Sequence, residues 1–268
     1  MNKTTLLRYV NSLAKLPVHK FDYRIKSKLP IYLNDVLLGL LLSDGYLEKS
    51  SPTSGARLTV SFGSKHSAYL NFLYKLFEPY TNSEPTKISV LNKKTKVLSE
   101  VVRFKTVMLP QLVWYHNLFY SKSSSLANGK LVKIIPSNIM ELISPVVLAH
   151  LIMGDGNLKM PDKIIRIYTN SFTKSDVELL AKAINKKLGI AAKATLDRND
   201  QYMITISKSQ LSLVIAQLKT HMHSSMSYKL GLQPEECVSD VQELKFSELN
   251  DFGPDCIKYD EMLKNWDQ

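Results

Sequence analysis

Asp44 and Asp155 are the residues of this sequence whose setting points most directly to chemistry. Each closes a short apolar segment, LLGLLLSDG at 37–45 and LAHLIMGDG at 148–156, and the two aspartates lie 111 residues apart. An apolar run that ends in Asp-Gly is typical of a buried helix ending at a glycine. Two such helices packed side by side would bring both carboxylates to one end, where a divalent cation relieves their repulsion. The pair therefore predicts a shared metal site.

The segments after each aspartate repeat in the same order, which indicates an internal duplication. Strict alternation at 56–63 and again at 165–170 predicts half-buried strands. A helical pattern, a hairpin and another helix follow in both halves. We therefore predict an α+β fold of two pseudo-symmetric αββαββα repeats, each with a saddle-shaped antiparallel sheet, packed through the two motif helices.

This organisation predicts five parts of the chain. In order, they are a basic N-terminal arm or helix at 1–29, a first repeat at 30–120, a linker and entry to the second repeat at 121–140, a second repeat at 141–232 and an acidic tail at 233–268.

Charge is distributed unevenly along the 268 residues. The formal net charge is +11, yet residues 233–268 hold ten acids against three lysines, so the first 232 residues carry about +18. Such an excess suits a polyanionic partner, although a solvated basic surface has the same composition. Residues 1–28 hold seven Lys or Arg and one acid, which fits a mitochondrial presequence, a basic arm or a first helix equally well.

Composition disfavours a membrane protein and a structure built on zinc or disulfide cysteines. No apolar run approaches the roughly 18–20 residues that span a bilayer, so we expect no membrane partner. The two cysteines, Cys237 and Cys256, form neither a zinc motif nor a disulfide framework.

The repeat resembles the LAGLIDADG homing endonucleases, in the single-chain form with two motifs, over roughly residues 30–232. Besides the two nonapeptides, the runs KIIPSN at 133–138, NSFT at 170–173 and MSYKL at 226–230 are similar to runs in an intron-encoded member of that family. The acidic sixth position of the consensus motif is Leu42 and Met153 here. His150 stands where the family favours a small residue, and we expect it to be a core or interface histidine opposite Gly39.

The resemblance implies a monomeric, mitochondrial, site-specific endonuclease that cuts both strands of a long asymmetric DNA target across the minor groove during intron homing. It implies Mg²⁺ as cofactor, with Mn²⁺ able to substitute. By resemblance, Asp44 and Asp155 hold the metal together with backbone carbonyls of Ser43 and Gly154. Lys133 and Lys229 are implied as the other catalytic residues, one at the end of each repeat. Ser61 and Asn170 are implied to order water around the metal.

DNA binding is expected from the polar faces of the sheets, whose alternate side chains would enter the major groove. A plain exposed polar strand face is an equally good explanation for any one of these residues. The predicted contacts are Arg57, Thr59, Lys87, Ser89, Arg103, Lys105, Arg166, Tyr168, Lys193, Thr195 and Thr205, with Lys94, Lys96 and Arg198 at hairpin tips touching phosphates.

Two other functions stay open at this point. The first is an RNA maturase that uses the same scaffold to assist intron splicing, with or without residual DNA cleavage, and whose partner is intron RNA. The second is a DNA-binding relative without catalysis. Retention of both aspartates and both lysines favours the endonuclease.

Overall fold

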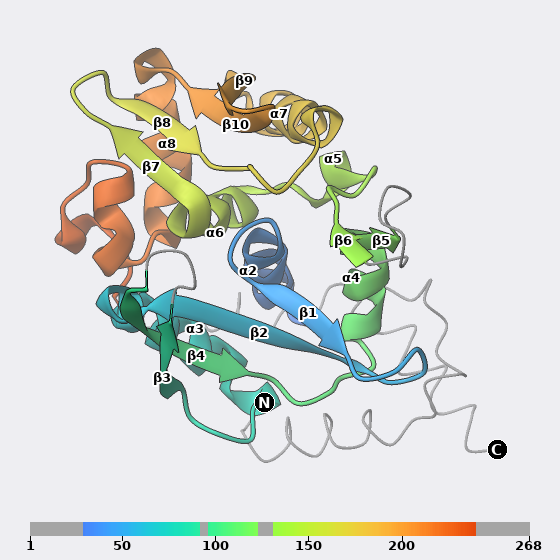
Figure 1. Cartoon of the computed structure of the whole chain (residues 1–268). Coiled ribbons are helices and arrows are strands. Elements are labelled where there is room, and N and C mark those ends of the chain that lie inside the picture. Colours follow the sequence, from blue (N-terminus) through green and yellow to red (C-terminus); the bar gives the residue numbers. More distant parts are fainter. Residues whose placement is uncertain (1–28, 92–95, 123–130, 240–268) are drawn as a thin grey trace. The chain divides into compact units, whose positions relative to one another are not determined.

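The computed structural model describes residues 29–91, 96–122 and 131–239 (Figure 1). Predictions for residues 1–28, for the tail beyond residue 239 and for Lys94 lie outside these ranges. The described chain separates into two compact units, one of residues 29–34 and 46–116 and the other of residues 35–45 and 117–239. The boundaries therefore differ from the sequence-based division, because most of the first motif segment groups with the second unit.

The first unit carries a four-stranded antiparallel sheet with strand order β1-β2-β4-β3. Its elements, together with the helices α2 and α4 that the unit boundaries divide, are α2 (Ile31–Leu41), β1 (Tyr46–Lys49), β2 (Ala56–Gly63), η2 (Ser64–His66), α3 (Ser67–Phe77), η3 (Glu78–Tyr80), β3 (Thr86–Leu91), β4 (Leu98–Lys105) and α4 (Leu112–Phe119). Helix α3 covers one face of this sheet, over β2 and β4 (Figure 1).

The second unit repeats this plan, with a sheet of strand order β7-β8-β10-β9. Its elements are β5 (Tyr120–Lys122), β6 (Leu131–Lys133), α5 (Ile139–Leu142), α6 (Pro145–Asp155), β7 (Gly156–Lys159), β8 (Ile164–Ile167), α7 (Lys174–Leu188), β9 (Ala192–Arg198), β10 (Gln201–Ile206), η4 (Lys208–Gln210), α8 (Leu211–Leu218), η5 (Lys219–His221), η6 (Ser224–Lys229) and η7 (Pro234–Glu236). The α+β class and the αββαββα order are thus confirmed in both halves.

Local sequence explains where the main helices begin and end. Helix α7 opens with a capping box, in which the Thr173 hydroxyl accepts from the Asp176 backbone N–H, and it closes at Gly189 with φ of +67°. Helix α6 opens with Ser144 as N-cap and Pro145 in its first turn. The Ser144 hydroxyl also donates to Asp35 Oδ2 at 2.6 Å, which joins the start of α6 to α2.

Hydrophobic alternation places the core on one face of each sheet. Leu58 and Val60 of β2 are fully buried, as are Ile204 and Ile206 of β10. In the second unit α7 packs on β9 and β10 and so covers that face. Within the described ranges, none of the helices combines the length and apolarity needed to cross a membrane.

One local prediction is wrong. The strand expected at 165–170 ends at Ile167, because its partner strand β7 begins only at Gly156 and the preceding residue, Asp155, still belongs to α6. The structure adds a short antiparallel pair of β5 and β6 that the sequence did not indicate, in which Tyr120 pairs with Lys133. That pair gives Lys133 a fixed place in the second unit.

Candidate active site and nucleic-acid interface

The two motif helices, α2 and α6, contact each other at glycine residues of both helices. A Cβ added to Gly39 would lie 2.6 Å from Cβ of His150 and 2.7 Å from the carbonyl oxygen of Val147. A Cβ added to Gly154 would collide with the Ser43 side chain. Only glycine allows backbones to approach this closely. The expected small-against-large pairing of Gly39 with His150 is therefore confirmed, and His150 is fully buried between the helices.

The close approach brings the two carboxylates to the same end of the helix pair. Asp44 follows α2, and its Oδ2 lies 3.3 Å from the position that a Cβ of Gly154 would take. Asp155 is the last residue of α6. Asp44 is exposed and Asp155 is half-buried, so the carboxylates reach solvent from partly enclosed positions.

Both carboxylates of the pair hold a proton more tightly than a free aspartate does. Partial burial raises the pKa of Asp44, against the opposing charges of Lys229 and Lys133. Burial, and then the negative charge of Asp44, raise the pKa of Asp155 to about 7. Each carboxylate also sits at the negative end of a helix dipole, which disfavours its charged form further.

Each predicted lysine binds two main-chain carbonyls at the end of one motif segment. Lys133 Nζ donates to the carbonyls of Ser43 at 2.9 Å and Gly45 at 2.7 Å. Lys229 Nζ donates to the carbonyls of Met153 and Gly154, both at 2.6 Å. The Met153 and Gly154 carbonyls lie in the last turn of α6 and lack intrahelical partners, so the Lys229 ammonium group satisfies them and offsets the helix dipole. The structure thus places both aspartates and both lysines at the same end of the pair of motif helices.

The two lysines differ in their surroundings. Lys229 is buried, whereas Lys133 is half-buried. Burial lowers the pKa of Lys133 to about 8, although the charges of Asp155 and Asp44 oppose that shift. A lysine with such a pKa can hold or release its proton near neutral pH.

Hard oxygen donors at this end suit a divalent cation. The described residues contain no cluster of three or more His, Cys, Asp and Glu side chains that could hold a metal. The two carboxylates would therefore act with main-chain carbonyls and with oxygens of substrate and water, which matches the few-carboxylate binding of Mg²⁺. The carbonyls of Ser43 and Gly154 accept lysine hydrogen bonds here, and each retains a second lone pair. The residues fit such an ion.

Ser61 and Asn170 occupy different backbone settings. Ser61 is half-buried on β2, directly opposite Arg103 of β4. Asn170 lies beyond the end of β8, and its amide nitrogen lies 3.5 Å from Asp197 Oδ2. Among the residues that the structure describes, the buried Oδ1 of Asn170 has no hydrogen-bond partner, which suits a group that binds water.

On the second sheet, four predicted DNA-binding residues share one face. Directly opposed residues in antiparallel strands point to the same side, and the register pairs Thr205 with both Arg166 and Lys193. Thr195 joins them through its pairing with Met203. A hollow of about 450 Å³ lies over this face, lined by Arg166, Lys193, Thr195 and Thr205 together with apolar Ile164 and Leu196. Tyr168 and Arg198 are exposed nearby in the chain.

On the first sheet, the register corrects three of the predicted contacts. Lys87 lies opposite buried Val102, and Ser89 lies opposite Glu100, so both share the core-side face. Edge strand β3 is mostly exposed on both sides, and its sequence therefore carried no reliable information about faces. Thr59 is fully buried and donates to Glu48, so it does not reach a DNA surface.

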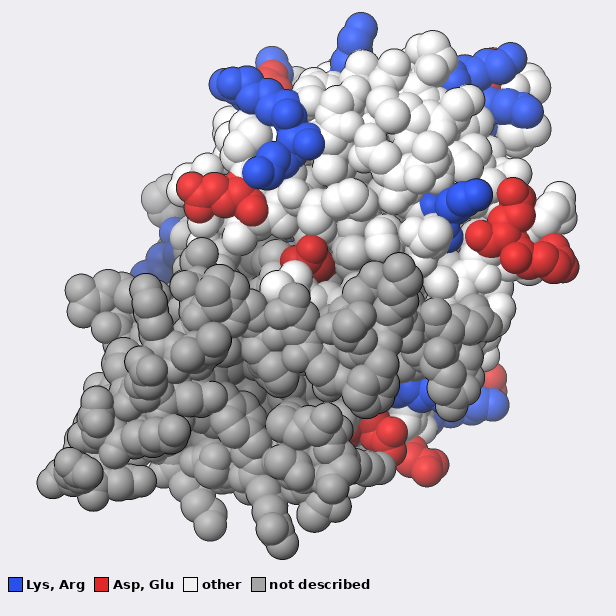
Figure 2. All heavy atoms as spheres, turned by 180° about the vertical axis from the view of Figure 1, so that it is seen from behind, with Lys and Arg blue, Asp and Glu red and all other residues white. Residues whose placement is uncertain are grey.

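The remaining predicted residues of the first unit stay on its polar face or surface. Arg57 of β2 and Lys105 and Arg103 of β4 lie on the face opposite the core, by the same register argument. Lys96 is exposed just before β4. Seen from behind, the described surface carries its Lys and Arg side chains in separate groups, with acidic groups beside several of them and broad uncharged areas between (Figure 2). Charge on that view therefore does not single out a binding face.

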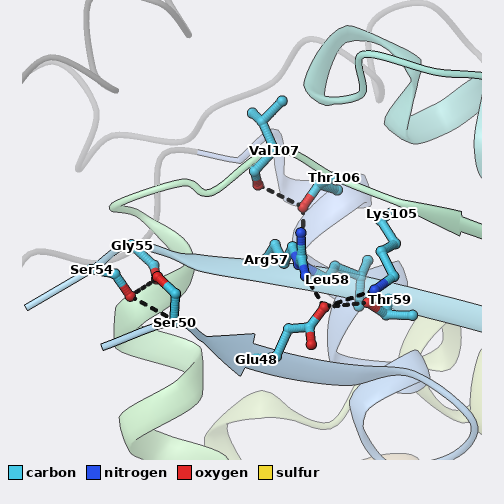
Figure 3. Close-up of polar contacts among 10 residues, drawn as sticks. All are labelled: Glu48, Ser50, Ser54, Gly55, Arg57, Leu58, Thr59, Lys105, Thr106 and Val107. Carbon is cyan, nitrogen blue, oxygen red and sulfur yellow. Dashed lines mark hydrogen bonds and ion pairs between the residues drawn. The ribbon is translucent and has the colours of Figure 1, made fainter. Parts of the chain in front are cut away.

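Glu48 is a polar residue of this face that the sequence did not single out. It lies on β1 opposite Arg57, and its Oε1 accepts from Arg57, Lys105 and Thr59 (Figure 3). The signal that reveals it is strand pairing, since Glu48 and Lys105 lie 57 residues apart.

Known proteins match this chain in sequence. The model of the LAGLIDADG DNA endonuclease family matches residues 34–213. Among curated proteins, the chain is 27% identical over 237 residues to the cytochrome b mRNA maturase bI2 of Debaryomyces hansenii, with 86% of each chain covered. It is 28% identical over 207 residues to the DNA endonuclease I-ChuI of Chlamydomonas applanata, covering 74% of this chain and 93% of that protein.

A solved structure shares the fold. The homing endonuclease I-WcaI, in a structure bound to its DNA recognition sequence, superposes with a TM-score of 0.67 at 22% identity. The match covers 87% of this chain and 99% of that one.

Proposed function

Because the chain belongs to the LAGLIDADG DNA endonuclease family, we propose that it cuts both strands of a long, asymmetric DNA target across the minor groove. The observation that carries this proposal is the joint end of α2 and α6, where Asp44, Asp155, Lys133 and Lys229 meet. Retention of both aspartates favours an enzyme over a relative that only binds.

The chain's own residues have defined tasks in phosphodiester hydrolysis. Asp44 and Asp155 would hold Mg²⁺, with Mn²⁺ as a substitute, and the bound ion would lower the pKa of water and offset charge on the phosphate. Lys133 and Lys229 place positive charge beside the scissile phosphates, where negative charge grows in the transition state. The pKa of Lys133, near 8, also lets it exchange a proton with an attacking water.

Target recognition would use the polar sheet faces. Strand side chains that reach base edges in the major groove give sequence specificity, while phosphate contacts fix register. The two sheets carry different side chains at equivalent places, for example Arg57 opposite Glu48 in one and Ile164 opposite Lys159 in the other. Two unlike halves predict an asymmetric target, and one chain carries both, so we propose a monomer. We also propose a mitochondrial location, which rests on the family resemblance.

The similarity to a cytochrome b mRNA maturase supports a second function. In that alternative the chain binds intron RNA and assists splicing, with or without DNA cleavage. Intact metal-binding and lysine residues favour the endonuclease.

The test is cleavage of a DNA library that spans intronless organelle gene junctions, incubated with Mg²⁺, Mn²⁺ or Ca²⁺. The proposal expects one double-strand cut with Mg²⁺ or Mn²⁺. No cut in any library member, together with tighter binding to structured intron RNA than to duplex DNA, would replace the endonuclease with the maturase.

A further inference from the structure

One carboxylate organises the cationic side chains on the polar face of the first sheet. Glu48 Oε1 lies 2.5 Å from Arg57 Nε, 3.1 Å from Lys105 Nζ and 3.3 Å from the Thr59 hydroxyl (Figure 3). These residues come from three adjacent strands, β1, β2 and β4. Arg57, Glu48 and Lys105 each keep about a third of their side-chain surface exposed, at 36%, 33% and 31%. The cluster is therefore held in place and remains open to a ligand.

The fold itself does not require this cluster. The second sheet has the same strand order and pairs its first two strands in the same way, yet Lys159 and Ile164 take the places of Glu48 and Arg57. Lys159 turns to Asp162 on its own hairpin, at 2.6 Å. Exposed ion pairs also add little to stability. A sheet of this register forms without an acid at the first strand, so the acid in the first unit calls for another explanation.

The geometry leaves part of the arginine available. Glu48 engages Arg57 through Nε, and the end-on edge of a guanidinium, formed by its two Nη groups, is separate from that atom. A guanidinium fixed in one plane can donate in bidentate fashion to O6 and N7 of guanine. Lys105 is fixed by the same oxygen.

The cluster also lowers the net positive charge of this face of the sheet. Burial raises the pKa of Glu48, but the hydrogen bonds from Arg57 and Lys105 outweigh it and keep that pKa below its usual value. Glu48 is thus ionised at neutral pH and cancels one of two positive charges. Fewer net charges weaken binding to phosphates of any sequence, which is the non-specific part of DNA affinity.

We propose that Glu48 is a positioning residue for DNA recognition: it holds Arg57 and Lys105 as oriented donors on the sheet and reduces their attraction to phosphates of any sequence. This inference rests on the proposed binding of duplex DNA by that face. It assigns to an acidic residue a role in selectivity on a surface that is otherwise basic.

The test compares the wild-type chain with Glu48→Gln, which keeps the side chain's shape and removes its charge. Affinity is measured over a salt series for two probes, a duplex of random sequence and the duplex that the wild type selects from a randomised library. We expect Glu48→Gln to bind the random duplex about threefold more tightly. We also expect the slope of log K against log salt concentration to become steeper by up to about 0.9, which corresponds to one extra phosphate contact. We expect the ratio of selected to random affinity to fall about fivefold or more.

Glu178→Gln is the matched control. Glu178 pairs with Lys174 on the exposed surface of α7, at 3.8 Å, so its loss changes net charge equally without touching the sheet. Thermal unfolding of both variants shows that each is folded. Equal effects of the two variants, or an unchanged affinity ratio in Glu48→Gln, would overturn the inference.

A wild-type chain that binds neither duplex would contradict the proposed DNA function itself, and this inference with it. In an Arg57→Met background, Glu48→Gln should lower the ratio less than it does in the wild-type background, because only Lys105 then remains for Glu48 to orient.

Discussion

Gly39 of one motif helix lies directly against His150 of the other, at a point where a Cβ on Gly39 would stand 2.6 Å from His150 Cβ. The pair fixes how closely α2 and α6 approach, and the same approach brings Asp44 to the end of α6. Packing in the middle of the helices and chemistry at their ends are thus two consequences of one contact.

Replacement of Gly39 by Leu should therefore destabilise the chain. Overpacking of a filled core costs about 1–3 kcal/mol, and here the new atoms would also meet the Val147 carbonyl. Urea unfolding measures the loss. Gly63→Ala is the control, because a Cβ at Gly63 meets nothing within 4 Å. Equal stability of Gly39→Leu and wild type would contradict the close helix contact.

Burial of His150 predicts acid sensitivity. Burial, followed by the charges of His221 and His223, lowers the pKa of His150 to about 3 from its usual 6.5. The unfolded chain therefore binds this proton more readily, so the contribution of His150 is complete above about pH 6.5 and is lost as the pH falls towards 3. His150→Leu should unfold with a weaker pH dependence than the wild type in this window, as measured by urea unfolding. An identical dependence would contradict the neutral, buried histidine.

The raised pKa of Asp155 predicts that stability depends on pH in the opposite direction. Its pKa of about 7 exceeds the usual 3.8, so the folded chain binds this proton more tightly than the unfolded chain. The resulting stability is present below about pH 3.8 and is lost as the pH rises through 7. In metal-free buffer well above pH 7, Asp155→Asn should raise the Tm, and added Mg²⁺ should raise only the Tm of the wild type. A lower Tm for the variant would contradict the strained carboxylate pair.

Much of this site could be predicted from the sequence because it is encoded locally. Each Asp-Gly motif specifies its own helix end, and the repeat pairs the two motifs, so Asp44 and Asp155 were expected together. Lys133 and Lys229 came from the family resemblance, and the β5–β6 hairpin that carries Lys133 was not predicted.

Strand faces at the edge of the first sheet could not be predicted in the same way. Alternation reveals a face only where one side is buried, and β3 is mostly exposed on both sides. Lys87 was therefore placed on the wrong face. Burial of Thr59 and the role of Glu48 depend on neighbours from other strands, which no local pattern contains.

The corrected faces predict unequal effects for two cationic residues of one strand pair. Arg103 lies on the polar face of β4, whereas Lys87 lies on the core-side face of β3. Arg103→Ala should weaken binding to the selected duplex by about 1–3 kcal/mol, the size of a base contact. Lys87→Ala removes the same charge and should change affinity little. Gel-shift titration measures both, and a larger effect of Lys87→Ala would contradict the assigned faces.

The central claim is that Asp44 and Asp155 perform the cleavage and are not needed to bind DNA. The most direct test is cleavage of a supercoiled plasmid carrying the selected target by Asp44→Asn, Asp155→Asn and the double variant in Mg²⁺, with binding measured in parallel in Ca²⁺. We predict that the double variant leaves both strands intact and retains binding close to that of the wild type. Cutting by the double variant at the wild-type rate, or loss of binding by a variant with an unchanged Tm, would contradict the account.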